Sequence, residues 1–409
     1  MRPMSPAQAE SPYAWARLAA SLALMTLGGV AMYGVVVVLP AVQAEFGVAR
    51  ADAALPYTLT MIGFGIGGVL MGMLADRYGV MVPVLVGALG LGSGLILAGL
   101  SATILQFALI HGLLAGMLGC SATFAPLVAD VSLWFTKRRG MAVAICISGN
   151  YLAGAVWPPV LQHFFDASGW RATYIGVGIF SIAFMLPLAW MLRKRPPAIA
   201  PAAVAAAAAK AERPLGLSPN ALTVLLSIAG VACCVAMSMP QVHIVAYCGD
   251  LGYGAQRGAE MLSLMLGFGI VSRLASGWIS DRIGGLRTLL LGSVLQGVAL
   301  ALFVPFNGLA SLYVISALFG LFQGGLVPAY PIIVREFFPP REAGAKVAIV
   351  LTATLLGMAL GGWLSGAIFD LTGSYRAAFI NGIGWNLLNL SIAFWLLRRA
   401  GMQRSLAAA

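Results

Sequence analysis

The sequence is poor in charge. Only 9% of its 409 residues are Asp, Glu, Lys or Arg, whereas 60% are hydrophobic. A soluble domain carries about 25% charged residues, so this chain cannot cover a water-facing surface, and lipid is the expected solvent for most of it. A spanning helix needs about 20 apolar residues. The length therefore holds about a dozen spans joined by short loops.

Side chains that build metal and catalytic sites are also scarce. The chain has five cysteines without a C-x-x-C pair and three histidines. This spacing supports neither a metal site nor a disulfide framework, so we expect the cysteines to be small packing residues. The motifs H-E-x-x-H and G-x-x-x-x-G-K-[ST] do not occur. We therefore expect no intramembrane enzyme, no ATP site, no metal and no cofactor.

The apolar runs predict an all-α membrane protein with twelve spans. They lie near 16–42, 53–75, 81–100, 104–134, 140–163, 171–193, 219–247, 258–281, 287–305, 309–334, 345–369 and 376–399. The first run follows a polar, Pro-containing segment without the pattern of a cleavable signal peptide, so we expect a true span. Glycine runs in spans two and eleven are expected to let helices approach closely.

Basic residues predict the orientation. One set of alternate connecting segments holds 19 Lys and Arg residues and the other holds four, which leaves Arg273 inside a span. The positive-inside rule then places both termini in the cytoplasm. The net charge of +11 is explained in the same way, so we expect no nucleic-acid partner. A plasma membrane is the expected location, and a bacterial inner membrane fits best.

The chain repeats itself at an offset near 205. The motif GMLADRYG at 72–79 ends span two, and GWISDRIG at 277–284 ends span eight. Asp, Gly and Arg recur at 166–171 before span six and at 370–376 before span twelve. Two separated motifs at one offset predict two related halves.

The repeat predicts the domain organisation. Residues 1–193 and 219–409 form two pseudo-symmetric six-helix halves, and the basic, Pro- and Ala-rich segment 194–218 is a cytoplasmic linker. Parallel repeats of this kind are typical of transporters, whose substrate site lies near the midplane and is exposed to each side in turn.

The motif G-x-x-x-D-R-x-G resembles the signature of the major facilitator superfamily. Val80 and Met81 replace the two basic residues that normally follow it, and Gly285 and Leu286 stand in the second copy. A carboxylate at a helix end pairs with Arg and with a neighbouring helix N-terminus, so we expect a gate latch, with a static salt bridge as the alternative. The latch residues are Gly72, Asp76, Arg77, Gly277, Asp281 and Arg282.

Further motifs resemble the monocarboxylate porters and the related oxalate/formate exchangers. They are WFTKRRG at 134–140, SGNYLAG at 148–154, GWRATY at 169–174, HIVAYCGDLG at 243–252 and SRLASG at 272–277. The sequence departs from that pattern at Gly269, where the animal branch has an Asp. It also lacks a Lys in span one and a second cation in span eleven.

Arg273 is the most informative residue. It precedes Asp281 by eight residues, or about 12 Å along a helix, which places it near the middle of span eight. A charge there costs about 2.5–3.5 kcal/mol, and its repeat counterpart is the uncharged Gly68. A guanidinium fork matches a carboxylate, and one cation favours a monoanion. The alternative is an Arg bonded to backbone carbonyls at a broken helix.

Other side chains are weaker candidates for the substrate site. They are His243, Asn150, Tyr151, Gln241, Gln323 and Tyr330, each with an interhelical hydrogen bond as the alternative. His243 and Asp130 are also candidates for proton coupling, although Asp130 is more simply paired with Lys137, Arg138 or Arg139. His111 and His163 lie near the outer ends, where solvated or interfacial roles suffice.

These patterns predict a secondary carrier of a small monocarboxylate, functional as a monomer. Proton symport and anion exchange both remain open. An exporter of larger amphipathic compounds would use the same fold with a wide apolar cavity and without dependence on Arg273. A non-transporting sensor would carry a soluble output domain, for which the segments outside the spans are too short.

Overall fold

The computed structural model describes residues 10–135, 138–194 and 214–408. Twelve helical segments of this part are long and apolar enough to cross a membrane, which confirms the predicted spans. The first six are α1–α2 (Pro12–Gly28, Val30–Phe46), α3 (Arg50–Tyr78), α4 (Met81–Gly99), α5–η1–α6 (Ile104–Ile110, His111–Cys120, Ala125–Trp134), α7 (Arg139–Ser168) and α8 (Trp170–Trp190). The rest are α9 (Pro219–Asp250), α10 (Ala255–Ile283), α11 (Gly285–Leu302), α12–α13 (Leu309–Gln323, Leu326–Phe337), α14 (Pro340–Thr372) and α15 (Tyr375–Ala408).

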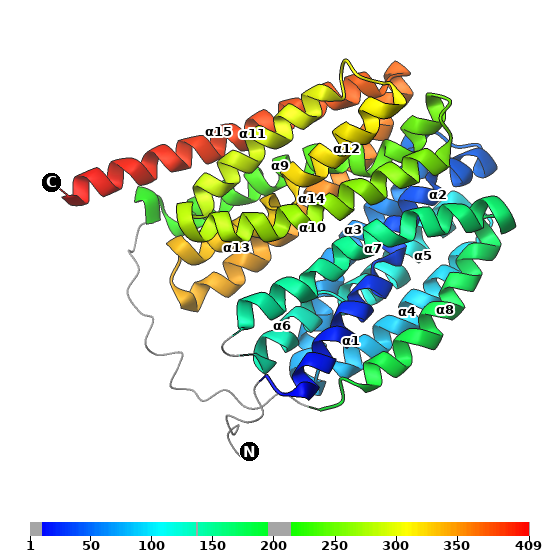
Figure 1. The fold of residues 1–409 in the computed structure, drawn as a ribbon, viewed down its shortest axis with the longest axis horizontal. Helices are drawn as coiled ribbons and strands as arrows, with labels where there is room; N and C mark the ends of the chain where they lie inside the picture. The colour runs from blue at the N-terminus through cyan, green and yellow to red at the C-terminus, as the bar shows by residue number, and fades with distance from the viewer. Residues whose placement is uncertain (1–9, 136–137, 195–213, 409) are drawn as a thin grey trace. The chain divides into compact units, whose positions relative to one another are not determined.

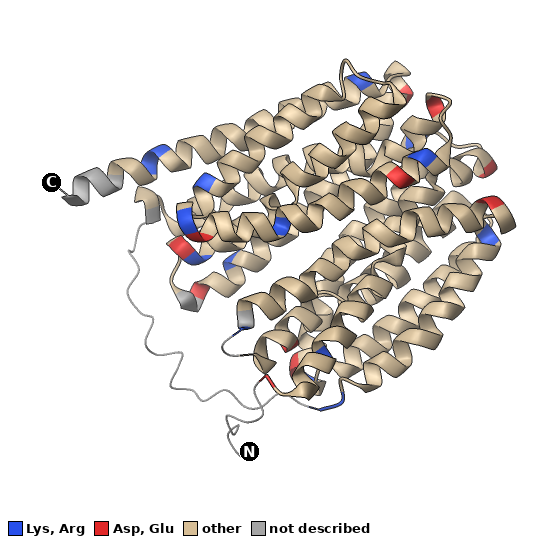
Figure 2. Ribbon diagram, viewed as in Figure 1, with Lys and Arg blue, Asp and Glu red and all other residues tan. Residues whose placement is uncertain are grey.

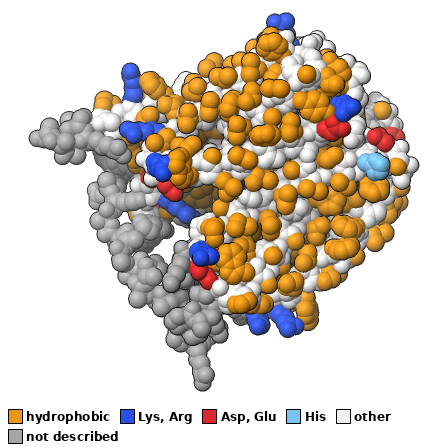
Figure 3. All heavy atoms as spheres, in the orientation of Figure 1, with side chains coloured by type: hydrophobic (Ala, Val, Ile, Leu, Met, Phe, Trp, Pro, Cys, Tyr) orange, Lys and Arg blue, Asp and Glu red, His pale blue; other side chains and the backbone are white. Residues whose placement is uncertain are grey.

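The surface of the helices is apolar. Lys, Arg, Asp and Glu lie mainly near helix ends, and long stretches between them carry no charge (Figure 2). Hydrophobic side chains dominate the face drawn in Figure 3. Ile66 and Val69, in the middle of α3, are 54% and 56% exposed. We expect such apolar side chains to face lipid, because the chain has too little charge to cover a water-facing surface.

Contacts divide the chain into two compact units. The first unit comprises Met1–Ala200 with His243–Gly267, and the second comprises Pro201–Val242 with Phe268–Ala409. The end of α9 and the first half of α10 therefore pack within the first unit (Figure 1). The six-helix halves 1–193 and 219–409 follow from the sequence repeat and stay a prediction. The predicted linker falls largely outside the described residues, which resume at Pro214.

Glycines let helices pack closely inside each unit. A Cβ added to Gly67 of α3 would lie 2.0 Å from the Met117 carbonyl oxygen of η1. In the second unit, a Cβ on Gly357 of α14 would lie 2.5 Å from the Val231 carbonyl oxygen of α9. These distances leave no room for a side chain, so the predicted role of the glycine runs holds here. A Cβ on Gly68 would meet nothing within 4 Å.

The repeat is visible in the backbone. Gly79 follows α3 with φ 87° and ψ 161°, and Gly284 follows α10 with φ 83° and ψ 163°. Their amides donate to the carbonyls of Ala75 and Ser280 at 2.8 and 2.9 Å. Positive φ favours glycine because it has no Cβ. The same sequence motif therefore ends span two and span eight with one backbone geometry.

Spans four and ten are both interrupted near the middle. Span four breaks at Thr123–Phe124, between η1 and α6, and span ten breaks at Gly324–Gly325, between α12 and α13. A proline follows each break, Pro126 in α6 and Pro328 in α13. Proline has no N–H to donate to the carbonyl four residues earlier. Spans four and ten are therefore interrupted for the same chemical reason, because a proline after the break cannot form the helical hydrogen bond across it.

Candidate functional site

Close packing brings Arg273 to the break in span ten. A Cβ on Gly324 would lie 2.4 Å from the Gly269 carbonyl oxygen, and one on Gly325 would lie 1.8 Å from Ser276 Oγ. Gly269 and Ser276 flank Arg273 on α10. Helix α10 therefore rests directly on the broken backbone, and the half-buried Arg273 side chain lies beside it.

The break supplies a carbonyl that needs a donor. Pro328 cannot donate to the carbonyl of Gly324, and Arg273 Nε donates to that oxygen at 3.5 Å. This is the backbone contact named above as the alternative to an anion site. The bond is long, hence weak, and a guanidinium carries five N–H donors. One Arg can therefore hold a carbonyl and an anion together.

Gln323 ends α12 next to this carbonyl. Its side chain is fully buried, and neither its amide oxygen nor its amide nitrogen has a hydrogen-bond partner within the part of the chain that the structure describes. A buried polar group left unpaired costs about 1–3 kcal/mol. Two polar side chains therefore lie at the break in span ten: the Arg273 guanidinium and the unpaired Gln323 amide.

Tyr330 belongs to the apolar core of the second unit. Its hydroxyl donates to Asn389 Oδ1 at 3.0 Å, and Asn389 Nδ2 donates to Ser293 Oγ at 2.7 Å. These bonds join α13, α15 and α11. They are the interhelical bonds that formed the alternative to a substrate role for Tyr330.

The candidates in spans five and seven are buried, except for Asn150, which is half-buried. Asn150 of α7 accepts a hydrogen bond from the Tyr33 hydroxyl at 3.1 Å, and Tyr151 is 6% exposed. His243 and Gln241 of α9 are 2% and 6% exposed. His243 packs in the first unit and Gln241 in the second.

Asp130 pairs with a different residue from those expected, of which Lys137 lies outside the described residues. Arg17 of α1 donates to both carboxylate oxygens of Asp130, from Nε at 2.6 Å and from Nη2 at 2.8 Å. The two side chains are 1% and 4% exposed, and the guanidinium carbon lies 4.8 Å from the Trp134 ring centre. The first helix begins at Pro12, so Arg17 lies inside the span rather than in a loop. Its position only one residue before the first apolar run was the signal that could have revealed this.

The latch residues lie at helix ends. Asp76, Arg77, Asp281 and Arg282 are exposed at the ends of α3 and α10, and neither carboxylate forms an ion pair with another described residue. Arg282 instead stacks over Trp278, with 3.4 Å between its guanidinium carbon and the ring centre.

A different carboxylate meets a helix N-terminus in the second unit. Glu336 of α13 accepts a hydrogen bond from the Gly285 amide of α11 at 2.8 Å. The latch function of the two aspartates and of Gly72 and Gly277 stays a prediction.

His111 does not have the solvated role expected for it. It is fully buried at the start of η1, with its ring centre 5.0 Å from that of Phe107 and 5.7 Å from that of Tyr174. The Thr60 hydroxyl donates to the Pro56 carbonyl at 2.6 Å, so it can accept from His111 Nδ1 at 3.3 Å. Aromatic packing across three helices creates this burial. His163 is exposed, as expected.

One ion pair has no counterpart in the sequence predictions. Arg50, at the start of α3, donates to both oxygens of Asp250, at the end of α9, over 3.1 and 3.2 Å. Ser263 of α10 donates to the Ala155 carbonyl of α7 in the same unit. Charges of opposite sign in the predicted segments after span one and after span seven were the available signal.

Metal ligands do not gather. Among the described residues there is no group of three or more His, Cys, Asp or Glu side chains that could hold a metal ion. The five cysteines are buried as free thiols.

Comparison with known proteins agrees with this architecture. A family model described as "Major Facilitator Superfamily" matches residues 19–311 and 261–406. "Monocarboxylate transporter 13" of Bos taurus is 28% identical over 318 residues, which cover 75% of this chain and 71% of that protein. "Agnestins efflux protein AgnL12" of Paecilomyces divaricatus is 24% identical over 339 residues, covering 82% and 75%.

The fold is also shared with a solved structure. A bacterial homologue of the human lysosomal transporter Spinster, in an inward-facing and occupied conformation, superposes with a TM-score of 0.73 at 16% identity, covering 95% of this chain and 98% of that one. This similarity concerns the fold alone. With the family match over most of the sequence, the twelve spans and the internal repeat, the chain belongs to the major facilitator superfamily and is a multi-pass membrane transporter, not an enzyme.

Proposed function

We propose that the protein moves a small monocarboxylate across the plasma membrane by alternating access, and that Arg273 binds the carboxylate. Arg273 carries the proposal, because it is a cation in the middle of an apolar span at a broken helix. Discontinuous helices in transporters commonly form ion and substrate sites. A carboxylate that accepts two N–H bonds from a guanidinium gains both charge pairing and a fixed orientation.

Gln323 supports the same site. Its buried amide lies one residue from the Gly324 carbonyl that Arg273 contacts, so a bound anion with hydrogen-bonding oxygens would satisfy the amide nitrogen. Similarity to monocarboxylate transporters of mammals points to the same substrate class. Both termini lie in the cytoplasm in this proposal, and the protein acts as a monomer.

Proton coupling is the proposed source of net movement, with His243, a buried imidazole of α9, as the candidate carrier. Asp130 is less suited to this task, since Arg17 already holds both of its oxygens. Exchange of one anion for another would need no proton.

The test is uptake of labelled carboxylates into proteoliposomes with and without an inward proton gradient. Arg273→Lys and Arg273→Ala should each reduce saturable uptake at least about 100-fold, the loss expected when a buried bidentate pair is broken at a cost of about 3–5 kcal/mol. Arg398→Lys, an exposed Arg near the end of α15, is the matched control. Normal uptake in both Arg273 variants would refute the site, and acceleration by the gradient would separate symport from exchange.

Export of larger amphipathic compounds is a second candidate. Fungal relatives that include an efflux protein support it. It predicts that cells expressing the protein resist such compounds and that Arg273→Ala leaves this resistance intact.

A further inference from the structure

Helix α10 touches the break in span ten on both sides of Arg273. Gly269, Arg273 and Ser276 follow one another at spacings of four and three residues, which places them on one face of the helix. A Cβ added to Gly324 would lie 2.4 Å from the Gly269 carbonyl oxygen. One added to Gly325 would lie 1.8 Å from Ser276 Oγ. All five residues belong to the second unit, so both contacts lie within one unit.

The backbone of the break does not require its two glycines. Gly324 has φ −59° and ψ −24°, and Gly325 has φ −90° and ψ −7°. Positive φ is the conformation that favours glycine over other residues, and both φ angles here are negative. An alanine can adopt either conformation, so the glycines are explained by the close approach of α10.

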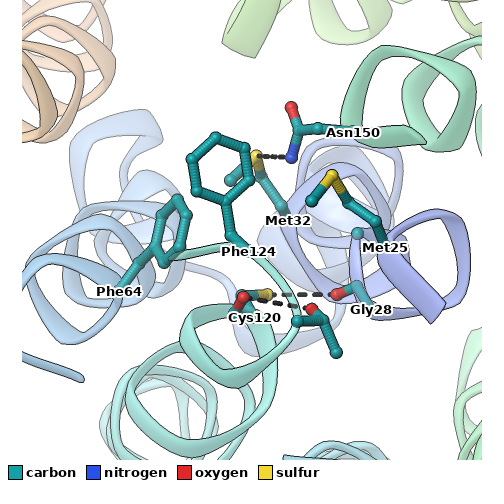
Figure 4. Close-up of a pocket in the computed structure, with 9 residues that line it drawn as sticks. Met25, Gly28, Met32, Phe64, Cys120, Phe124 and Asn150 are labelled. Atoms are coloured by element: carbon teal, nitrogen blue, oxygen red, sulfur yellow. Dashed lines mark hydrogen bonds between the residues drawn. The ribbon is translucent and has the colours of Figure 1, made fainter. Parts of the chain in front are cut away.

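The break in span four shows that such a break tolerates a large side chain. Thr123 and Phe124 form it, and neither is a glycine. The Phe124 ring meets the Phe64 ring of α3 edge to face, with 5.7 Å between the ring centres (Figure 4). In the first unit, a side chain at the break therefore packs against the helix of span two. In the second unit, the helix of span eight approaches the bare backbone of Gly325 instead.

One side chain fills the space in front of Gly325. A Cβ there would lie 1.8 Å from Ser276 Oγ and 2.1 Å from Ser276 Cβ, whereas the next atom, the Ser272 carbonyl oxygen, would be 3.6 Å away. The last distance is an ordinary van der Waals contact. A rotamer change moves Ser276 Oγ but not its Cβ, so a methyl group at Gly325 requires α10 itself to move.

The same contact fixes Arg273 relative to the broken backbone. Arg273 lies about one helical turn from Ser276, and its Nε donates to the Gly324 carbonyl at 3.5 Å. Pro328 has no N–H for this carbonyl. A displacement of α10 away from the break by about 1 Å would lengthen the bond beyond the hydrogen-bonding range. The position of the guanidinium therefore depends on how closely α10 meets Gly325.

We propose that Ser276 and Gly325 are positioning residues, whose close fit sets where the Arg273 guanidinium meets the transported carboxylate. This inference rests on the proposed function. A two-point pair between a guanidinium and a carboxylate depends on geometry as well as on charge. Crowding at Gly325 should therefore weaken substrate binding through Arg273, and removing the crowding group from Ser276 should restore it.

The experiment moves a side chain across this contact and measures the apparent KM of labelled carboxylate uptake in proteoliposomes. Gly325→Ala should raise KM about tenfold. Adding Ser276→Gly removes both atoms that overlap the new Cβ and should return KM to within about twofold of native. Adding Ser276→Ala instead removes only Oγ and leaves Cβ at 2.1 Å, so it should restore KM less.

Gly292→Ala is the matched control for crowding. A Cβ on Gly292 of α11 would lie 2.8 Å from Leu326 Cδ2 of α13, so it crowds the same broken span from a helix that does not carry Arg273. This variant should lower the melting temperature in detergent and keep KM within about twofold of native. A merely structural role for Gly325 predicts the same pair of results for Gly325→Ala.

The outcomes separate the inference from the proposed function. Saturable, Arg273-dependent uptake with native KM in Gly325→Ala would overturn the inference while the proposed function stands. The same conclusion follows if the variant with both Gly325→Ala and Ser276→Gly binds as weakly as Gly325→Ala alone. Uptake that does not depend on Arg273 would overturn the proposed function and the inference with it.

A second variant decides the question if Gly325→Ala does not fold. Ser276→Gly by itself adds no atom and leaves the space in front of Gly325 empty, so Arg273 loses its fixed position. Its KM should rise about threefold. A native KM in Ser276→Gly would then overturn the inference.

Discussion

Two arginines inside apolar helices are stabilised in different ways. Arg17 is fully buried and forms a two-point pair with Asp130, so its charge is compensated within the protein. Arg273 is half-buried and contacts a carbonyl that a proline left without its usual donor. The two-point pair explains Arg17 as part of the structure of the first unit, whereas a binding role for Arg273 stays a proposal.

Replacing one member of the Arg17–Asp130 pair should destabilise the protein more than replacing both. Asp130→Asn leaves an uncompensated buried guanidinium and should lower the free energy of unfolding by about 3–5 kcal/mol, whereas the double variant Arg17→Met with Asp130→Leu should recover much of that loss. Thermal unfolding in detergent would measure both. Equal losses in the single and double variants would contradict the pairing.

At the scale of the element, the interrupted spans matter most. Spans four and ten carry prolines at Pro126 and Pro328, and each has its break just before the proline. The proline positions could be read from the sequence, but the packing of α10 against Gly324 and Gly325 could not. That packing depends on which helix face turns inward, and hydrophobic periodicity does not specify the face when a helix is apolar on all sides.

Neighbouring glycines of α3 should differ sharply in their tolerance of a methyl group. Gly67→Ala would place Cβ 2.0 Å from the Met117 carbonyl oxygen, whereas Gly68→Ala meets nothing within 4 Å. We expect Gly67→Ala to lower the melting temperature and the yield of folded protein, at a cost of about 1–3 kcal/mol for overpacking. Gly68→Ala should stay close to native. A Gly67→Ala protein as stable as Gly68→Ala would show that α3 and η1 are not in contact in the membrane.

On the scale of the whole molecule, the C-terminal end of α9 and the N-terminal half of α10 pack in the first unit. Arg50 and Asp250 join α3 to α9, and Ser263 joins α10 to α7. A carrier that alternates between two states must break some contacts in one of them. We expect the Arg50–Asp250 pair to be one of the contacts that break and re-form during transport.

Charge reversal tests this role. Arg50→Asp places two carboxylates together and should shift the conformational equilibrium by about 1–3 kcal/mol, which slows uptake several-fold. The double swap Arg50→Asp with Asp250→Arg should restore much of the rate. Uptake assays on the singles and the swap measure this, with Arg257→Asp as the control for reversing an exposed Arg, which lies in the first turn of α10 and pairs with Glu260 of the same helix. If the double variant takes up substrate as slowly as Arg50→Asp alone, the Arg50–Asp250 pair does not contribute to transport.

The amino-acid sequence was enough to predict the twelve spans, the family and the repeat motif at Gly79 and Gly284. These features are local, because apolar length and backbone hydrogen bonding decide whether a segment can cross lipid. The partner of Arg17, 113 residues away, and the partner of Arg50, 200 residues away, came only from the tertiary structure. So did the contact between Arg273 and the broken backbone at Gly324. Such contacts depend on which faces of different helices touch, and in a chain that is apolar almost throughout, close packing rather than hydrophobic pattern makes that choice.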